Sequence, residues 1–336
     1  MNGLHSREKA CIRDTGEESR DPTVSIIVVT YNHVNLLQEA VESVLMQIVD
    51  FPCEILIGDD ASTDGTSDLV REYALKYPKI IIPFIRNENF GAAKNSYMLL
   101  QQARGEYIAL LEGDDYWTDP CKLQKQIEFL SAHPEYIGCT HRLKYVDANG
   151  VPLHKKPHWI GKKQVFTLHD FNGIRLPGQA SSLVRRNIFL HPKHDYSVLF
   201  KLDPMVSDRT SALIFLLQGD FYRLRDIMGA YRYVAASKKE NLTSKLFREN
   251  DRIEKDFQMA CYMEEYAKTE FGVHKSFAPL KRELYAKAFL RAIRMRSHDL
   301  FSTARRMRQS DKKGYYYILA LPFNIVKLVW RRLRGA

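Results

Sequence analysis

A short apolar run that stops at three carboxylates constrains this chain more than any other feature. Residues Tyr107 to Leu111 are apolar, and Glu112, Asp114 and Asp115 follow within four residues. Such a run, bounded by glycine and polar residues, is typical of a buried strand. Ligands of open α/β sheets bind beyond the carboxyl ends of the strands, so these acids are expected beside a ligand. The alternative is an acidic turn that caps the next helix.

The three carboxylates also predict a cation. Like charges this close repel and raise one another's pKa unless a cation neutralises them. Mg²⁺ or Mn²⁺ is the natural partner, because hard divalent cations take oxygen ligands and share their coordination with substrate phosphates. The sequence has no glycine-rich phosphate loop of the dinucleotide-binding or P-loop kind. We therefore expect the metal to hold the phosphates.

Apolar runs alternate with amphipathic helical segments through the first third of the chain. This alternation is typical of βαβ units and of a largely parallel sheet. Pro83 indicates that the third strand is irregular or at an edge. The expected strands are 24–29, 54–57, 80–85 and 107–111.

In a parallel sheet, the loops that follow these strands meet at one edge. The loops after the first, second and fourth strands carry Thr30 and Tyr31, Asp59 and Asp60, and the acids that begin at Glu112. Carboxylates can bind ribose hydroxyls or a base N–H, an aromatic ring can stack on a base, and a metal can screen phosphates. The convergence therefore suits a nucleoside diphosphate.

Charge is distributed unevenly along the chain. The formal net charge is +10, but residues 281–336 carry 15 Lys and Arg against 3 Asp and Glu, so the first 280 residues carry −2. A basic groove through the body of the protein is not expected, and an acidic cleft repels a phosphate backbone. We therefore expect no nucleic-acid partner.

Five cysteines lie far apart without metal-ligand spacing, which fits free thiols in a reducing cytosol. Residues 1–21 are charged and without periodicity, and we expect a flexible leader without a signal peptide. No run reaches the roughly 20 apolar residues of a spanning helix. The expected location is cytoplasmic.

Four motifs, taken together, resemble the family 2 glycosyltransferases, which are inverting enzymes of the GT-A fold that use nucleotide-sugar donors. The resemblance covers about residues 22–235. Each motif is modest alone, but their order and spacing are specific. The motifs are Ser25 to Asn32, Gly58 to Gly65, Asn89 to Gly91 with Asn95, and Glu112 to Trp117.

The resemblance implies a role for each matched position in the nucleotide-sugar site. Thr30 and Tyr31 would line the nucleoside pocket, and Asp60 with Asp59 would bind the base or ribose. Contacts to the nucleotide or its phosphates are expected from four further residues: Asn89, Lys94, Glu112 and Asp114.

The acidic motif matches the family's metal motif, often written Asp-x-Asp, except that Glu112 leads it here. As metal ligands we expect Asp115 first and Asp114 second. The substitution leaves open which carboxylates touch the metal.

Asp208 resembles the family's catalytic base, a carboxylate just before a helix. Inversion requires a base within hydrogen-bond reach of the attacking acceptor hydroxyl. A helix cap formed by Ser207 or Asp208 is the alternative, and Asp195 and Asp203 are competitors for the role. The Tyr-Arg-x-His often found near the end of the family's core lacks its histidine in Tyr231–Val234, so Arg232, or the lysines at 238 and 239, would replace it.

From about residue 240 the chain is expected to be helical and basic. It ends in an aromatic and apolar segment, residues 315–330, followed by arginines. Basic residues beside apolar ones suit an anionic membrane surface, whereas Pro322, Asn324 and Lys327 argue against a spanning helix. Packing of the last helix back on the protein is the alternative.

The sequence thus predicts a Rossmann-like, mostly parallel GT-A sheet flanked by helices, with a helical basic C-terminal extension. The expected domains are 22–236, with a nucleotide-sugar half (22–118) and an acceptor half (119–236), and an extension, 237–336. The predicted activity is transfer of a sugar, with a UDP-sugar as the expected donor, to a glycan or lipid-linked acceptor in bacterial surface polysaccharide biosynthesis. Two alternatives remain: a polyprenyl-phosphate glycosyltransferase, and a non-enzymatic, basic, membrane-associated adaptor.

Overall fold

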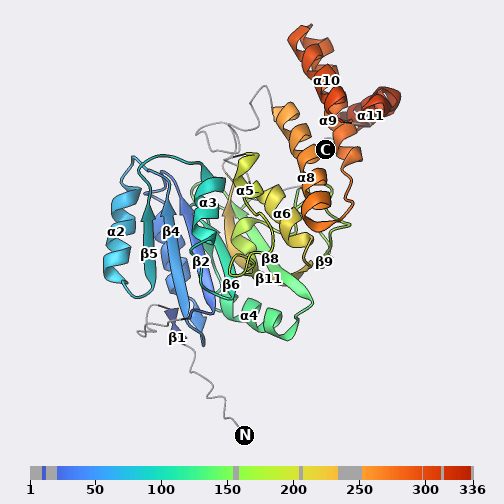
Figure 1. Ribbon diagram of the computed structural model, residues 1–336. Helices are drawn as coiled ribbons and strands as arrows, with labels where there is room; N and C mark the ends of the chain where they lie inside the picture. The colour runs from blue at the N-terminus through green and yellow to red at the C-terminus, as the bar shows by residue number, and fades with distance from the viewer. Residues whose placement is uncertain are drawn as a thin grey trace. The chain divides into compact units, whose positions relative to one another are not determined.

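The computed structural model describes residues 10–12, 21–153, 159–203, 207–233, 252–296, 298–311 and 314–333. The chain divides into two compact units, residues 1–233 and 234–336, which Figure 1 shows as a mixed α/β part and an all-helical part. The predicted boundary at 236–237 falls outside the described residues and stays a prediction. Among the described residues, no helix is long and apolar enough to cross a membrane.

A nine-stranded sheet forms the centre of the first unit. Neighbouring strands run parallel from β5 to β6, and β8 and β11 are parallel as well, while β10, β7 and β9 are antiparallel to their partners. In order, the strands are β5 (Ile81–Ile85), β4 (Cys53–Asp59), β2 (Val24–Thr30), β6 (Tyr107–Glu112), β10 (Val184–Arg186), β8 (Tyr136–Val146), β11 (Asp220–Arg232) and β7 (Tyr116–Trp117), with β9 (Val165–Phe166) beside β11. The predicted α/β sheet is confirmed, and β5 lies at its edge as Pro83 indicated.

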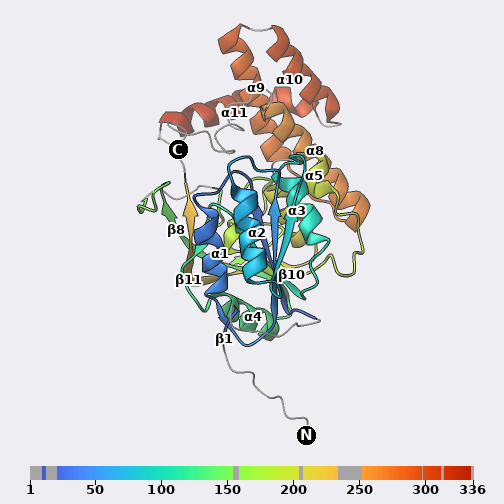
Figure 2. The ribbon, with the colours of Figure 1, turned by 90° about the vertical axis from the view of Figure 1, so that its left-hand side faces the viewer.

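Helices cover both faces of this sheet, and Figure 2 shows α1 and α2 side by side in front of it. One hydrophobic core joins α1 (Leu37–Leu45), α2 (Thr66–Lys76) and α4 (Lys122–Ala132) to the sheet. On the other face, α3 (Ala92–Leu100) packs on β2 and β4, and it contacts α5 (Val198–Lys201), which contacts α6 (Asp208–Leu216).

The apolar runs of the parallel strands are continuous because both of their faces are buried. Val24, Ile26 and Val28 belong to the core shared with α1, and Ile27, on the opposite face of the same strand, is also fully buried. The apolar runs expected from the sequence therefore correspond to the central strands.

Two local predictions are wrong. Within the expected flexible leader, β1 (Ala10–Cys11) pairs antiparallel with β3 (Ile48–Val49), and Ile12 is fully buried, because this apolar segment completes the core. Gly105, expected as the C-cap of the third helix, lies beyond the actual C-cap, Gln101. A Cβ at Gly105 would lie 2.4 Å from the backbone nitrogen of Ser25, so glycine permits close contact with β2.

The second unit is helical, as predicted. It comprises α8 (Arg252–Phe271), α9 (Ala278–Met295), α10 (His298–Ser310) and α11 (Tyr315–Leu333). The other three helices all contact α9. Its buried apolar residues include Phe257, Met263 and Leu284.

Candidate active site

The ends of β2, β4 and β6 meet at one edge of the sheet, as the sequence predicted. Thr30 pairs with Asp59 across β2 and β4, and Val29 pairs with Glu112 across β2 and β6. The next residues continue the pairing, because Asp60 N donates to Thr30 O at 3.1 Å and Gly113 N donates to Val29 O at 2.8 Å. The three polar loops therefore share one rim.

The loops after β2 and β4 are bound to each other. Asn32 accepts a hydrogen bond from Thr63 N at 2.8 Å through Oδ1, and Asn32 N donates to Ser62 Oγ at 2.9 Å. Asn32 and Ala61 have positive φ values of 55° and 62°, and non-glycine residues in this region often lie at functional sites. Tyr31, the residue before Asn32, is 45% exposed, so its ring is accessible for stacking.

Asp59 and Asp60 both hold the protein's own loops. Asp59 is fully buried, and its two carboxylate oxygens accept hydrogen bonds from the hydroxyls of Ser62 and Ser67. It therefore fixes the loop after β4, and its predicted contact with a base or ribose remains a prediction.

Asp60 connects this rim to the loop before α3. Its carboxylate accepts hydrogen bonds from Phe90 N at 2.9 Å and Gly91 N at 2.8 Å, and the Asn89 side chain donates to Asp60 O at 3.0 Å. Lys94 Nζ lies 4.1 Å from the centre of the Phe90 ring. The structure thus places Asn89 and Lys94, which were predicted to contact the nucleotide, in or beside the loop whose backbone N–H groups bind the Asp60 carboxylate.

Buried polar atoms without a hydrogen-bond partner mark this rim. Within the described part of the chain, Thr30 Oγ1, His33 Nδ1 and Arg86 Nη2 are in this state. A Cβ at Gly113 would lie 2.8 Å from Thr30 Oγ1 and 3.0 Å from His33 Nδ1, so both atoms border the acidic loop. Such atoms cost about 1–3 kcal/mol each and commonly bind a ligand or water. Sequence reasoning missed His33 and Arg86.

Four carboxylates influence one another at the end of β6. Burial, and then the charges of Asp115, Asp114 and Asp208, raise the pKa of Glu112 well above its usual value, while a hydrogen bond from Gln179 opposes the rise. Asp208 is 96 residues further along the chain, at the start of α6. The fold therefore brings the expected catalytic base to the expected metal motif.

Asp115 has a structural role in this cluster. Its side chain is fully buried, Ser181 Oγ donates to Oδ2 at 2.5 Å, and Arg232 N donates to Oδ1 at 2.9 Å. Burial, then Asp114, raises the pKa of Asp115 well above its usual value, against these two hydrogen bonds. Asp115 thus ties the acidic loop to the 3₁₀ turn Ala180–Ser182 and to β11. The sequence had predicted Asp115 as the first metal ligand, and that role stays a prediction.

Arg232 is also held by the protein itself. Nη1 donates to Asp114 O at 2.6 Å, Nη2 forms an ion pair with Glu39 on α1, and the guanidinium lies over the Tyr116 ring. These contacts fix the acidic loop from its other side. The lysines at 238 and 239, offered as alternatives to Arg232, lie outside the described residues.

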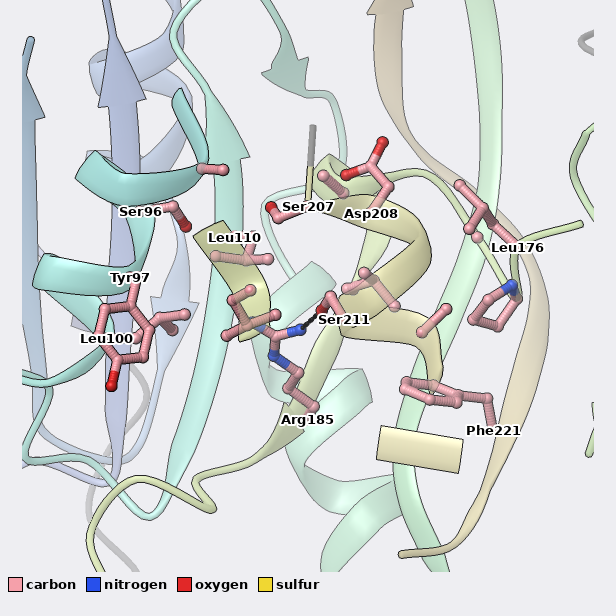
Figure 3. Close-up of a pocket in the computed structure, with 17 residues that line it drawn as sticks. Ser96, Tyr97, Leu100, Leu110, Leu176, Arg185, Ser207, Asp208, Ser211 and Phe221 are labelled. Atoms are coloured by element: carbon pink, nitrogen blue, oxygen red, sulfur yellow. Dashed lines mark hydrogen bonds between the residues drawn. The ribbon is translucent and has the colours of Figure 1, made fainter. Parts of the chain in front are cut away.

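Asp208 is the first residue of α6 and lines a small cavity of about 40 Å³, which is partly open to solvent. Ser207, at the N-cap position, forms no side-chain capping bond. Figure 3 shows the Asp208 carboxylate in the upper part of the group of lining residues, with Arg185 below it in the view and hydrogen-bonded to Ser211. Burial raises the pKa of Asp208, whereas the charge of Arg185 lowers it. The competitor Asp195 is hydrogen-bonded to its own loop at Ser197 N.

The donor set fits a cation that is shared with a substrate. The described residues contain no group of three or more His, Cys, Asp or Glu arranged as a metal site. Mg²⁺ and Mn²⁺ are usually held by only one or two carboxylates together with substrate phosphates and water. Glu112 and Asp114 supply such carboxylates. Burial first, and then the neighbouring carboxylates, raise the pKa of Glu112, and a cation would neutralise these like charges.

Sequence comparisons agree with these features. The model of glycosyl transferase family 2 matches residues 25–191. A putative teichuronic acid biosynthesis glycosyltransferase, TuaG of Bacillus subtilis, is 39% identical over 137 residues, which cover 41% of this chain and 53% of that protein. The uncharacterized protein Rv1520 of Mycobacterium tuberculosis is 44% identical over 127 residues, which cover 38% and 37%. The matches thus span about half or less of these relatives.

Two solved structures share the fold over most of their length. S. aureus TarS 1-349, in complex with UDP-GlcNAc, superposes with a TM-score of 0.59 and 18% identity over 93% of this chain and 92% of that one. The mannosyltransferase PcManGT from Pyrobaculum calidifontis, in complex with GDP-Man and Mn²⁺, gives a TM-score of 0.50 and 17% identity over 94% and 88%. The family match, the sheet and its converging loops show that the chain belongs to glycosyl transferase family 2, with a GT-A fold.

Proposed function

We propose that this protein transfers a sugar from a nucleotide-sugar donor to a hydroxyl of a glycan or lipid-linked acceptor, with inversion, in bacterial surface polysaccharide synthesis. The observation that carries the proposal is the shared rim of β2, β4 and β6, together with Asp208, which lies near enough for its charge to act on Glu112. A UDP-sugar is the proposed donor, because the neighbour TarS is bound to UDP-GlcNAc. PcManGT, bound to GDP-Man, makes GDP-sugars the first alternative.

Donor binding is assigned to the loops that follow β2 and β4 and to the start of α3. Tyr31 is accessible to stack on the base, and Thr30 Oγ1 is a buried hydroxyl that lacks a partner among the described residues. Asp60 holds the neighbouring loop in place, and Lys94 is a cation beside that loop. These residues would bind the nucleotide and orient its diphosphate toward the acidic loop.

Asp208 is assigned the role of the base. In inversion, the acceptor oxygen attacks the anomeric carbon opposite the leaving diphosphate, and a carboxylate takes the hydroxyl proton. Burial raises the pKa of Asp208 toward the operating pH, which strengthens a carboxylate as a base, while Arg185 keeps the ionised form accessible.

The metal ligands are assigned to Asp114 and Glu112 in place of Asp115. Both oxygens of Asp115 accept hydrogen bonds from the protein, and its side chain is fully buried, whereas Asp114 and Glu112 are partly exposed. A bound Mn²⁺ or Mg²⁺ would offset the negative charge that develops on the leaving diphosphate. The proposed location is cytoplasmic, peripheral on the inner face of the cell membrane.

A thermal-shift screen tests the proposal. Purified full-length protein is melted with UDP-, GDP- and dTDP-sugars, with and without Mn²⁺. We expect one nucleotide class to raise the Tm, and to raise it more with Mn²⁺. A protein that melts cooperatively but responds to none of these donors would contradict the proposed function.

Thr30→Val tests the assigned pocket. This variant removes a buried hydroxyl without a described partner, so the Tm of the free protein should stay the same or rise. The donor-induced increase in Tm should shrink. Thr269→Val, on α8, is the matched control, because Thr269 is exposed in the second unit. An unchanged donor response in Thr30→Val would remove Thr30 from the site.

A further inference from the structure

One face of α11 is apolar and exposed. Leu319 is 74% exposed, Phe323 is 73% exposed and Val326 is 66% exposed. Their spacing of four and three residues places them on one side of the helix. We call these three residues the outer face of α11. Single exposed apolar residues are common on protein surfaces, but a stripe along one helix indicates an interaction surface.

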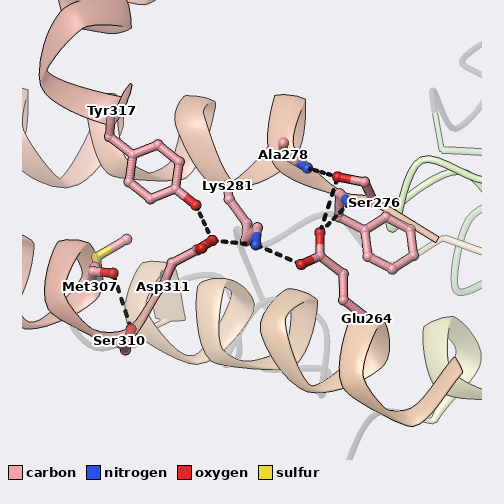
Figure 4. Close-up of polar contacts among 9 residues, drawn as sticks. Glu264, Ser276, Ala278, Lys281, Met307, Ser310, Asp311 and Tyr317 are labelled. Carbon is pink, nitrogen blue, oxygen red and sulfur yellow. Dashed lines mark hydrogen bonds and ion pairs between the residues drawn. The ribbon is translucent and has the colours of Figure 1, made fainter. Parts of the chain in front are cut away.

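The opposite face of α11 is fixed to the rest of the helical unit. Tyr317 is 2% exposed, and its hydroxyl donates to Asp311, which also pairs with Lys281. Lys281 Nζ lies 2.6 Å from Glu264 Oε2, so one connected network links α8, α9 and α11 (Figure 4). Asn324, two turns further along, is 8% exposed. These contacts set the rotation of α11 and leave Leu319, Phe323 and Val326 pointing away.

Charge indicates what covers the outer face. Residues 281–336 carry 15 Lys and Arg against 3 Asp and Glu. Arg294, Arg296 and Arg305 are exposed on the neighbouring helices α9 and α10 or at their ends. An apolar helix face within such a basic region fits an anionic lipid surface, where basic residues near the membrane strengthen binding. A second copy would instead bring two strongly positive regions together.

We propose that the outer face of α11 docks on an anionic lipid bilayer, with Leu319, Phe323 and Val326 inserted at the boundary between headgroups and acyl chains. The helix lies in the plane of the surface and does not cross it, in keeping with the lack of a spanning helix among the described residues. This inference concerns the helical unit and does not depend on the proposed transfer reaction.

Vesicle flotation of the full-length protein tests the proposal. The vesicles are pure phosphatidylcholine, or phosphatidylcholine with about 30% phosphatidylglycerol as the anionic lipid. We expect binding to the anionic vesicles, little binding to the neutral ones, and release at high salt. Leu319→Glu should weaken binding by about tenfold or more, because one apolar insertion is lost and a repelled charge is gained.

The matched control is Leu75→Glu. Leu75 is an 82% exposed leucine on α2, in the other unit, so this variant adds the same charge without changing α11. It should bind like the wild type. Both variants should keep the wild-type helical content and Tm, since neither side chain is buried.

Three results would overturn the proposal. The wild type could bind neither kind of vesicle, or Leu319→Glu could bind as tightly as Leu75→Glu, which would place any membrane contact elsewhere. Alternatively, light scattering could show a dimer that Leu319→Glu converts to a monomer while lipid binding is absent. The outer face would then be covered by a second copy of this chain.

Discussion

Replacing each of the two adjacent aspartates, Asp114 and Asp115, by alanine gives the sharpest test of the acidic loop. Asp115→Ala should destabilise the first unit, whereas Asp114→Ala should leave its stability nearly unchanged and remove the metal response. The reason is geometric. The carboxylate of Asp115 accepts two hydrogen bonds inside the protein, from Ser181 Oγ and Arg232 N, while only the backbone oxygen of Asp114 is bonded to Arg232.

The expected magnitude follows from these bonds. A hydrogen bond to a charged group contributes about 1.5–3 kcal/mol, and its loss also leaves a buried donor without a partner. Burial already disfavours the charged form of Asp115, so we take the lower end, about 3 kcal/mol for both bonds. For a unit of this size, 1 kcal/mol corresponds to about 2–4 °C in Tm. Asp115→Ala should therefore lower the Tm by about 6–12 °C, and Asp114→Ala by less than about 2 °C.

Thermal melts of the two variants, with and without Mn²⁺ and a UDP-sugar, provide the assay. The Tm of Asp115→Ala should still rise when Mn²⁺ and the UDP-sugar are added, although from a lower starting value. Asp114→Ala should lose the part of the Tm increase that depends on Mn²⁺. The reasoning would be refuted if Asp115→Ala melted like the wild type but no longer responded to Mn²⁺, because Asp115 would then be the ligand that the sequence first suggested.

Three further predictions concern single side chains. Asp208→Asn should keep the donor-induced Tm increase while transfer falls by about a hundredfold or more; equal loss of both would indicate a structural cap. The raised pKa of Glu112 favours the protonated form in the folded state, so its contribution is favourable at acid pH and is lost as pH rises through that pKa. In metal-free melts, Glu112→Gln should therefore be more stable than the wild type at pH 8, with the difference closing toward pH 5; a pH-independent difference would contradict this. Lys122 is fully buried over the Trp117 ring, its Nζ has no hydrogen-bond partner among the described residues, and burial lowers its pKa to about 7. The folded state therefore disfavours the charged form of Lys122, and the stability of the wild type should rise with pH between about 7 and 10. Lys122→Met should raise the Tm at pH 7, by an amount that shrinks toward pH 10. A lower Tm of this variant at pH 7 would contradict the reasoning.

The meeting of the ends of β2, β4 and β6 could be predicted from sequence alone. The strands from β2 to β6 are local apolar runs, and parallel pairing places their ends together whatever the details of packing. The sequence alone therefore predicts that Thr30, Asp59 and Glu112 lie at one rim, and the register of the strands agrees. The apolar outer face of α11 also lay in a segment whose composition had indicated a membrane surface.

Tertiary structure decided which of these side chains are engaged within the protein. The two partners of Asp115, Ser181 and Arg232, lie 66 and 117 residues away in sequence. No local pattern distinguishes Asp115 from Asp114, because both are acids in the same turn. The same applies to the leader, where Ala10–Cys11 forms a strand only because β3 offers an edge.

The sequence by itself determined the parallel strands, the helices between them and the chemistry collected at the rim, because periodicity and turn residues are local properties of the chain. Only the tertiary structure distinguished Asp115, which is buried and hydrogen-bonded within the protein, from Glu112 and Asp114, which stay partly exposed. That separation depends on burial and on hydrogen-bond donors contributed by distant segments, which are fixed only when β6, the 3₁₀ turn and β11 come together.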